Sequence, residues 1–257
     1  MFNFLKSKSA AAPRSYAMPE GHIAYGIGDV HGCFLSMLNL LVKIEQDRSN
    51  SGAEKSTVVF LGDLIDRGPS SKQVIEFLMS YKPDWTELAF VRGNHEEVML
   101  DVMSGNLSAM RSWFEFGGKD CARSYGVENF GQLLINPDHI MMALQRNVPK
   151  EHLAFMDSFS DAFAFGDYLM VHAGIKPKVA IEDQSPYDMR WIRSSFLNYD
   201  KPHPVKVVHG HTVVENGPEN HNNRIAVDTG AHKGRPLTAV RLFEGEESFI
   251  QSDASGT

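Results

Sequence analysis

Six short hydrophobic runs along the chain each stop at a glycine or a polar residue. The runs occupy residues 22–27, 57–61, 87–91, 168–171, 205–208 and 224–227. Runs of four to six mostly apolar residues that end in this way are typical of strands buried on both faces. We therefore predict six buried strands at these positions.

Helical spacing of apolar residues fills the gaps after the early runs. Residues 34–42 carry apolar side chains on one helical face, and residues 74–81 do so after Ser70, a residue type that caps helices. Strand, polar turn and helix in repetition predict parallel strands joined by helices. From about Asp167 strands outnumber helical patterns, which predicts a second sheet packed on the first within one domain.

The stretch from 101 to 165 is predicted to be a helical insertion beside the site. Pro137 and Pro149 each precede an apolar helical pattern, as prolines of a first helical turn do. Trp113 and Phe116 lie in the same stretch. Packing in the core is their expected role, and contact with a substrate is the alternative.

The ends of the chain differ from its middle. Residues 1–20 hold three basic residues and no acid before Glu20, which predicts a disordered N-terminal tail, with an organellar transit peptide as the alternative. We expect one domain over residues 21–246. Residues 247–257 are expected to form a solvated C-terminal tail.

Composition narrows the class of protein. The 257 residues are 42% hydrophobic and 22% charged, which is ordinary for a globular domain. The net charge of −7 disfavours nucleic acid as a partner, and no apolar run approaches the ~18–20 residues of a membrane span. Cys33 and Cys121 predict free thiols in a reducing, cytoplasmic setting. No feature of the sequence indicates an obligate partner.

The predicted strand ends carry residues that bind metals. These residues are Asp29, His31, Asp63, Asn94, His172 and His211. Ligand sites of open α/β sheets form at the carboxyl ends of strands, and carboxylate with imidazole suits Mn, Fe or Zn. Any one of the six alone would be a turn residue or a structural histidine. Together, each in its own glycine-flanked motif, they predict a metal site.

Three of these motifs resemble a known signature. They are Gly-Asp-Val-His-Gly at 28–32, Gly-Asp-Leu-Ile-Asp-Arg-Gly at 62–68 and Arg-Gly-Asn-His-Glu at 92–96. In this order they resemble the signature of the calcineurin-like metallophosphoesterases. The nearest pattern is that of the phosphoprotein phosphatase branch, the serine/threonine phosphatases, of bacterial type.

The resemblance extends over nearly the whole chain, from about Ile23 to Phe243. Val-His-Ala-Gly at 171–174 and Gly-His at 210–211 match the family's later metal histidines. The implied fold is an α/β, four-layer αββα sandwich of two mixed β-sheets flanked by helices. It agrees with the two sheets expected from the hydrophobic pattern.

The resemblance also implies a dinuclear centre of two divalent ions, with Mn²⁺ expected and Fe or Zn as alternatives. The first ion would be held by Asp29, His31 and Asp63. The second would be held by Asp63, Asn94, His172 and His211. Asp63 would bridge the two ions, and a bridging hydroxide would attack phosphorus.

One position near the last ligand departs from other branches of the superfamily, which carry Gly-His-x-His. Here Val213 takes the place of the second histidine, so only His211 is carried over. His209 is expected to be structural or to support a ligand.

Arginines inside and near the motifs are candidates for phosphate contacts. Arg67 and Arg92 precede glycines of two metal motifs, and the planar guanidinium fork matches phosphate oxygens. Arg193 is expected to supply a further contact, with Arg190 left open as the alternative. A surface ion pair is the competing role for each.

His95 and Asp66 are the candidate catalytic pair. An imidazole next to the ligand Asn94 is suited to protonate a leaving oxygen. Asp66 would accept a hydrogen bond from it and fix its tautomer.

These residues predict a metal-dependent phosphoester hydrolase acting on a phosphoprotein or a small phosphoester. A serine/threonine protein phosphatase is expected, because Asp66 and Glu96 stand where the related symmetrical bis(5'-nucleosyl)-tetraphosphatases usually carry Ala and Asp. Such a tetraphosphatase is the alternative enzyme. A non-catalytic scaffold of the same fold is the alternative of another class, disfavoured because no ligand position is lost.

Overall fold

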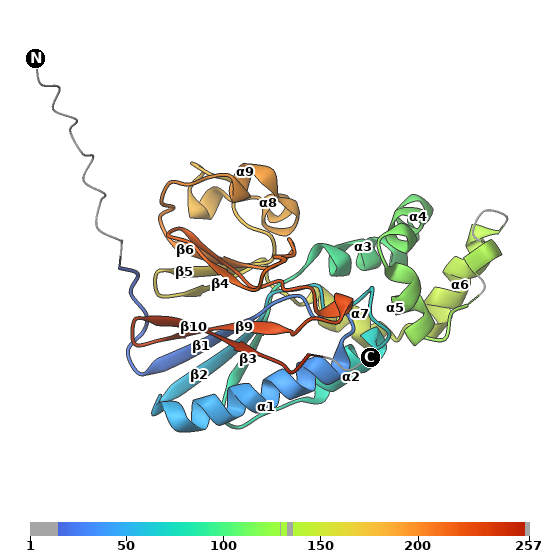
Figure 1. Ribbon diagram of the computed structural model, residues 1–257. Coiled ribbons are helices and arrows are strands. Elements are labelled where there is room, and N and C mark those ends of the chain that lie inside the picture. The colour runs from blue at the N-terminus through green and yellow to red at the C-terminus, as the bar shows by residue number, and fades with distance from the viewer. Residues whose placement is uncertain (1–14, 129, 133–135, 255–257) are drawn as a thin grey trace, which may run out of the picture.

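Two five-stranded sheets stack face to face between layers of helices in the computed structural model, which describes residues 15–128, 130–132 and 136–254 (Figure 1). The first sheet has the order β10-β9-β1-β2-β3. Its strands are β1 (His22–Ile27), β2 (Lys55–Phe60), β3 (Glu87–Phe90), β9 (Thr238–Phe243) and β10 (Glu246–Gln251). The second sheet has the order β4-β5-β6-β8-β7. Its strands are β4 (Ala162–Phe165), β5 (Tyr168–Val171), β6 (Lys206–His209), β7 (Glu219–Asn220) and β8 (Arg224–Ala226).

Helices cover the outer faces of both sheets, as the predicted αββα sandwich requires (Figure 1). The first sheet is covered by α1 (Phe34–Ser51) and α2 (Ser71–Ser80), and the second by α8 (Pro186–Trp191) and α9 (Ser194–Leu197). The remaining helices are α3 (Asn94–Met103), α4 (Leu107–Glu115), α5 (Gly118–Ser124), α6 (Pro137–Asn147) and α7 (Lys150–Asp157). Short 3₁₀ turns are η1 (Phe130–Gln132), η2 (Ile181–Asp183) and η3 (Ala231–Lys233).

Strand β1 shows why the two sheets stack. Ile23, Tyr25 and Ile27 alternate along it, are fully buried, and belong to the cluster that contains α1. Ala24 points the other way, into the cluster between the sheets. Because successive side chains of a strand face opposite sides, an apolar strand needs a partner layer on each face.

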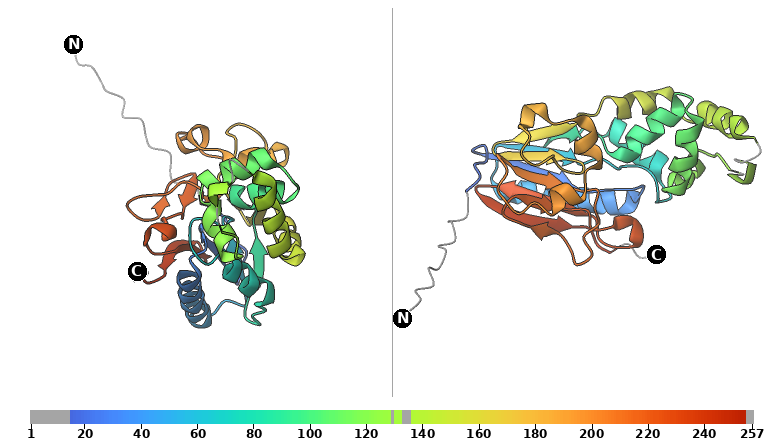
Figure 2. Two further views of the ribbon diagram at one scale, coloured as in Figure 1. Left: turned by 90° about the vertical axis from the view of Figure 1, so that its right-hand side faces the viewer. Right: turned by 90° about the horizontal axis from the view of Figure 1, so that it is seen from above.

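The functional residues gather at one edge because of strand direction. Strands β1, β2 and β3 run parallel, as do β5, β6 and β8, so the carboxyl ends within each sheet share an edge. The helices of residues 94–147 project beyond the sheets on one side (Figure 2). The helical insertion predicted over 101–165 therefore forms a wall that extends past the strand ends, but its last residues, 162–165, are wrong as helix because they form β4.

Both chain ends depart from the predicted domain limits. The expected C-terminal tail from 247 is wrong over its first residues, because β10 pairs antiparallel with β9 and Ser252 is buried. Of the expected N-terminal tail, residues 1–14 lie outside the described part of the chain. Tyr16 is buried and packs on Tyr168, so the ordered fold begins before residue 21.

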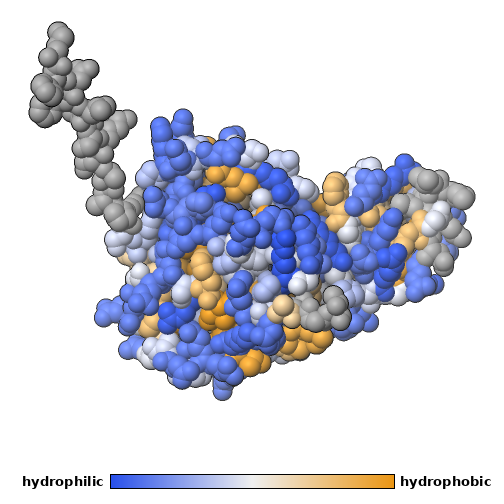
Figure 3. Space-filling view, viewed as in Figure 1, coloured by the Kyte–Doolittle hydropathy of each residue, from blue (hydrophilic) through white to orange (hydrophobic). Residues whose placement is uncertain are grey.

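The outer surface is mostly hydrophilic on the face shown in Figure 3, with small separate hydrophobic areas. Within the described ranges, no helix combines the length and hydropathy needed to cross a membrane.

Candidate metal centre and active site

The six predicted ligands meet at the carboxyl ends of the strands. Asp29 and His31 follow β1, Asp63 follows β2, Asn94 begins α3 after β3, His172 follows β5 and His211 follows β6. All six are buried. The structure thus brings together side chains that are up to 182 positions apart, as the backbone N–H of His211 and the carboxylate of Asp29 illustrate.

Asp63 lies at the centre of the group. Its Oδ2 is 3.6 Å from Nε2 of His31, and its Oδ1 is 3.4 Å from Nε2 of His172. Each carboxylate oxygen therefore faces a different set of nitrogen donors. This placement agrees with the bridging role that the resemblance implies.

Two clusters of donor atoms surround Asp63, each within 4.8 Å. One is formed by His31, Asp63 and His95, and the other by Asp63, His172 and His211. Asp29 lies next to the first cluster, with Oδ2 3.8 Å from Nε2 of His31. Its carboxylate accepts the backbone N–H of His211, at 3.0 Å from Oδ1, and so joins the two clusters.

The imidazoles are oriented for binding a cation. Nδ1 of His31 lies 2.8 Å from the carbonyl of Ile65, and Nδ1 of His172 lies 2.7 Å from the carbonyl of Leu61. These contacts assign the ring proton to Nδ1 and leave Nε2 as a lone-pair donor, as in metal sites. Among the described residues, the buried Nε2 atoms of His31 and His211 have no hydrogen-bond partner. The residues present therefore fit a metal centre.

The contact between His172 and its neighbours supports the same conclusion. Its Nε2 is 2.9 Å from Oδ1 of Asn94 and 3.1 Å from Nδ1 of His211. Three atoms that can each present a lone pair converge here, although one ring nitrogen holds at most one proton. A bound cation would satisfy all three together.

Unusual backbone conformations hold these loops. His31, Asp63, Asp66, Arg67 and His211 all have positive φ, between 46° and 72°. Such conformations are uncommon for residues other than glycine and cluster at functional sites.

Glu96 holds the loop that follows β2, in which Asp63 has a positive φ. Its carboxylate accepts backbone N–H groups from Asp63 at 2.9 Å, Leu64 at 2.7 Å and Gly93 at 3.0 Å. A Cβ on Gly93 would lie 2.2 Å from Oδ1 of Asp63, so only glycine allows this approach. Glu96 therefore positions the backbone of the loops that follow β2 and β3.

His95 and Asp66 form the expected pair. Nδ1 of His95 is 2.6 Å from Oδ2 of Asp66, and both side chains are buried. Burial alone would lower the pKa of His95, but the carboxylates of Asp63 and Asp66 outweigh it and raise the pKa above its ordinary value. The contact with Asp66 orients the ring, with Nδ1 on the carboxylate and Nε2 on the side of Arg67.

Trp113 adds a contact that the sequence did not reveal. Its Nε1 donates to the same Oδ2 of Asp66 at 2.8 Å, and the indole is 1% exposed. The expected core packing is confirmed for Trp113 and wrong for Phe116, which is 65% exposed. Trp113 also restrains the side chain of Asp66.

The arginines divide into two groups. Nη2 of Arg67 lies 3.1 Å from Nε2 of His95. Arg67 and Arg193 both line a cavity that also borders His95 and Asn94. Arg92 instead contacts Asp157, with Nη2 2.9 Å from Oδ1, and the structure does not bring it to the cavity. Arg190 is held by Glu97 and Asp161, so Arg193 is the one of the two that faces the site.

The cavity beside the candidate metal ligands has a volume of about 240 Å³. Its lining comprises Arg67, Asn94, His95, Val98, Trp113, Phe116, Trp191 and Arg193. Two arginines and the candidate acid His95 therefore share a small space with aromatic rings. Trp191 was not singled out in the sequence, because a tryptophan in a short polar segment gives no pattern that separates a cavity wall from a core residue.

Two further residues near the centre were also missed. Asp228 follows β8, is buried, and has an Oδ2 without a hydrogen-bond partner among the described residues. His232 packs edge-on against His31, with ring centroids 4.9 Å apart. Asp228 follows the apolar run at 224–227 and precedes Gly230, which is the same pattern that marks the predicted ligands. His232 stands in no such pattern. His209 instead packs edge-on against Phe196, consistent with a structural role.

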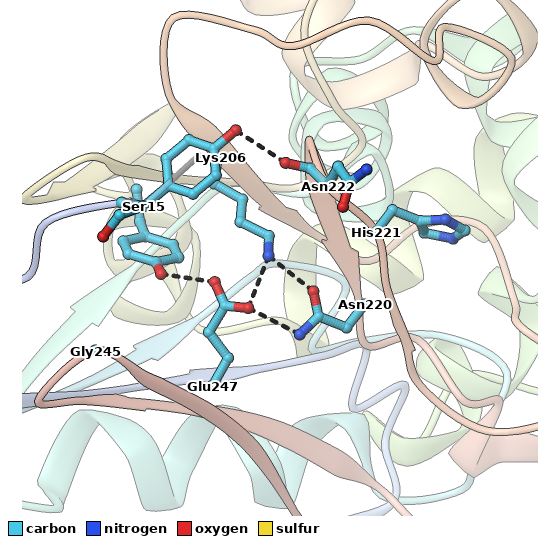
Figure 4. A pocket seen from close by; sticks show the side chains of 9 residues that line it. Ser15, Lys206, Asn220, His221, Asn222, Gly245 and Glu247 are labelled. Atoms are coloured by element: carbon cyan, nitrogen blue, oxygen red, sulfur yellow. Dashed lines mark hydrogen bonds and ion pairs between the residues drawn. The ribbon is translucent and has the colours of Figure 1, made fainter. Parts of the chain in front are cut away.

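A second cavity, of about 370 Å³, lies at the opposite ends of β5 and β6 (Figure 4). Glu247 there accepts hydrogen bonds from Tyr168, Lys206 and Asn220 at 2.6 to 2.8 Å. These polar groups satisfy one another's hydrogen bonds, so the network stabilises the ends of β5 and β6 that lie away from the candidate metal ligands.

The chain was compared with known families and curated proteins. A family model described as calcineurin-like phosphoesterase matches residues 25–238, which is most of the chain. The asymmetrical bis(5'-nucleosyl)-tetraphosphatase PrpE of Bacillus velezensis is 28% identical over 251 residues, covering 88% of this chain and 91% of the relative. A symmetrical bis(5'-nucleosyl)-tetraphosphatase of Methylococcus capsulatus is 30% identical over 154 residues, covering 60% of this chain and 43% of the relative.

Solved structures share the fold at lower identity. A crystal structure provisionally described as a diadenosine tetraphosphatase matches with a TM-score of 0.62 at 18% identity, covering 94% of this chain and 100% of the other. A serine/threonine phosphatase from Saccharomyces cerevisiae matches with a TM-score of 0.54 at 16% identity, covering 92% and 81%. The serine/threonine phosphatase branch expected from the motifs is not supported, because the curated relatives named above are tetraphosphatases.

Proposed function

This chain belongs to the calcineurin-like phosphoesterase family, and we propose that it is a metal-dependent bis(5'-nucleosyl)-tetraphosphatase. The observation that carries the proposal is the similarity to tetraphosphatases over 88% of the chain. The relatives matched over nearly their full length are of the asymmetrical kind, so we place the cut between the first and second phosphates.

The structure also removes a reason for preferring a protein substrate. Glu96 was expected to mark the protein phosphatase side, but its carboxylate binds the backbone of the β2 loop and does not line the cavity. Of the two distinguishing positions, only Asp66 has a role near the reacting groups.

The residues divide the chemistry among them. Asp29, His31, Asp63, Asn94, His172 and His211 would hold two divalent ions, with Mn²⁺ proposed and Fe or Zn as alternatives. When bound, such ions supply a water of lowered pKa and neutralise phosphate charge. Arg67 and Arg193 would bind phosphate oxygens, and His95 would donate the Nε2 proton to the leaving oxygen.

A phosphoprotein is the second candidate substrate, favoured by the pair of His95 and Asp66. The two atoms Nδ1 and Oδ2 are 2.6 Å apart, so the carboxylate supports the charged imidazole. Proton donation matters most for an alkoxide leaving group such as that of serine, and less for a polyphosphate that delocalises its own charge.

Product analysis tests the proposal. The protein with added Mn²⁺ is incubated with diadenosine tetraphosphate, and the nucleotides are separated by chromatography. Asymmetrical cleavage gives ATP and AMP, whereas symmetrical cleavage gives two molecules of ADP. An intact dinucleotide, under conditions in which a phosphoserine peptide is dephosphorylated, would establish the second candidate instead.

A further inference from the structure

Two aromatic rings from distant parts of the chain border the cavity beside the metal centre. Phe116 follows α4 in the helical insertion, and Trp191 ends α8 on the second sheet. Phe116 is 65% exposed, which is unusual for a large apolar side chain. An exposed ring beside charged catalytic groups is typical of a surface that binds a ligand.

The indole of Trp191 is fixed in place. Its Nε1 donates to Oε2 of Glu97 at 2.5 Å, and Oε1 of the same carboxylate accepts from Nη1 of Arg190 at 2.8 Å. Tyr187 stacks on it, with centroids 6.2 Å apart and planes 19° apart. The ring is therefore preorganised, and little conformational entropy remains to be lost when a ligand stacks on it.

The rest of the cavity separates into apolar and cationic parts. Val98 and Trp113 extend the apolar wall, and the indole nitrogen of Trp113 is already bonded to Asp66. Arg67 and Arg193 supply the positive charge. A ligand that satisfies both parts has a flat apolar ring system joined to phosphate.

Size limits how much of a ligand enters. The volume of about 240 Å³ lies below the ~300 Å³ at which cavities begin to enclose a whole drug-sized molecule. One base with its nearest phosphate is an appropriate occupant, and a complete dinucleoside tetraphosphate is too large.

We propose that the cavity between Phe116 and Trp191 binds one nucleobase of the substrate by stacking. The proposal rests on the proposed function and names the part of the substrate that these rings recognise. Because Phe116 and Val98 offer no hydrogen-bonding groups and the Nε1 of Trp191 is occupied, these walls bind a base by stacking and not by hydrogen bonds to its edge.

Binding of two ligands that differ only by the base tests this directly. Calorimetry in the presence of Mn²⁺ compares AMP with ribose 5-phosphate. We expect AMP to bind about 5- to 100-fold more tightly, the range for one base stacked on an aromatic ring. Phe116→Ala and Trp191→Ala should remove most of that difference, while Trp191→Phe should keep much of it. Met142→Ala, at an exposed position on α6, is the matched control and should change neither affinity.

The outcomes separate the subsite from the activity. Unaltered discrimination in Phe116→Ala and Trp191→Ala, both folded by thermal melting, together with unaltered turnover of the dinucleotide, overturns the stacking site and leaves the activity intact. Phenyl phosphate binding as tightly as AMP also overturns it, since any aryl ring would then suffice. Loss of AMP discrimination in Phe116→Ala, in a protein that does not cleave the dinucleotide, supports the subsite although the proposed activity has failed.

Discussion

Trp113 and His95 bind the same oxygen of Asp66, Oδ2, from two directions. The indole Nε1 is 2.8 Å from it and the imidazole Nδ1 is 2.6 Å from it. A buried carboxylate with two donors on one oxygen has little freedom to rotate. We therefore regard Trp113 as a positioning residue that acts through Asp66.

Trp113→Phe should lower kcat about tenfold and change KM little for phosphates that carry no base, because one hydrogen bond to a charged group is lost. The loss should be larger for alkyl than for nitrophenyl phosphates. Trp85→Phe, before β3 at the opposite edge of the sheet, is the control and should be silent. An equal loss of activity on all substrates, accompanied by lowered thermal stability, would show that Trp113 acts only in packing.

His95→Ala should lower turnover by roughly 10²–10⁴, the usual contribution of a positioned general acid. The loss should be smallest for a nitrophenolate leaving group, which needs little protonation. Because His95 also lies in one donor cluster with His31 and Asp63, metal content decides between its roles. Elemental analysis should find the metal unchanged, and depleted metal would make His95 a ligand.

Asp63→Asn should be the most damaging single change among the ligands, because each oxygen of Asp63 faces a different donor cluster.

A chelator should abolish hydrolysis and Mn²⁺ should restore it. Mn²⁺ should also raise the melting temperature of the wild-type protein, since an ion that binds only the folded state stabilises it. Full activity of protein shown to be free of metal would contradict the dinuclear assignment.

Glu247→Gln should destabilise the far edge of the second sheet in a pH-dependent way (Figure 4). Burial would raise the pKa of Glu247, but hydrogen bonds from Lys206, Tyr168 and Asn220 outweigh it and lower the pKa below its ordinary value. A lowered folded-state pKa stabilises the protein above the unfolded-state pKa, and this stabilisation is lost as the pH falls through the folded-state value. The variant should lose about 1–3 kcal/mol of unfolding free energy at pH 7.

The difference between Glu247→Gln and wild type should shrink as the pH falls below about 4, because the unfolded carboxyl takes up its proton first and the folded one follows at lower pH. Denaturant unfolding at several pH values measures it. Glu246→Gln, at an exposed position on the same strand, is the control. A constant difference from pH 7 to pH 3 would mean that the charge of Glu247 does not contribute.

The strands that carry the site were readable from the sequence, because each is an apolar run that ends in glycine and a polar residue. Strands β9 and β10 were not among the six runs. Arg241 interrupts the apolar pattern of β9, where it pairs with Asp47, and β10 is an edge strand with an exposed glutamate at its start. Without knowledge of the strand that pairs with it, the polar sequence of β10 cannot be distinguished from that of a solvated C-terminal tail.

The residues that meet at the strand ends were predictable from the sequence, and their surroundings were less so. Motif spacing identified the residues that meet, but not the side-chain directions set by tertiary contacts. Arg92 precedes a metal motif and yet turns to Asp157, and Glu96 serves the backbone. The positive φ of His31 and Asp63 depends on hydrogen bonds between loops, such as that from the His31 N–H to the Asp63 carbonyl at 2.8 Å.

One competition assay tests the central claim most directly. Diadenosine tetraphosphate and a phosphoserine peptide are mixed at equal concentration with the Mn²⁺-loaded protein, so that the ratio of initial rates equals the ratio of kcat/KM. We predict that the dinucleotide is consumed faster by at least about tenfold, corresponding to about 1.4 kcal/mol in transition-state binding, and that Asp63→Asn consumes neither. Faster consumption of the phosphopeptide would contradict the proposed function.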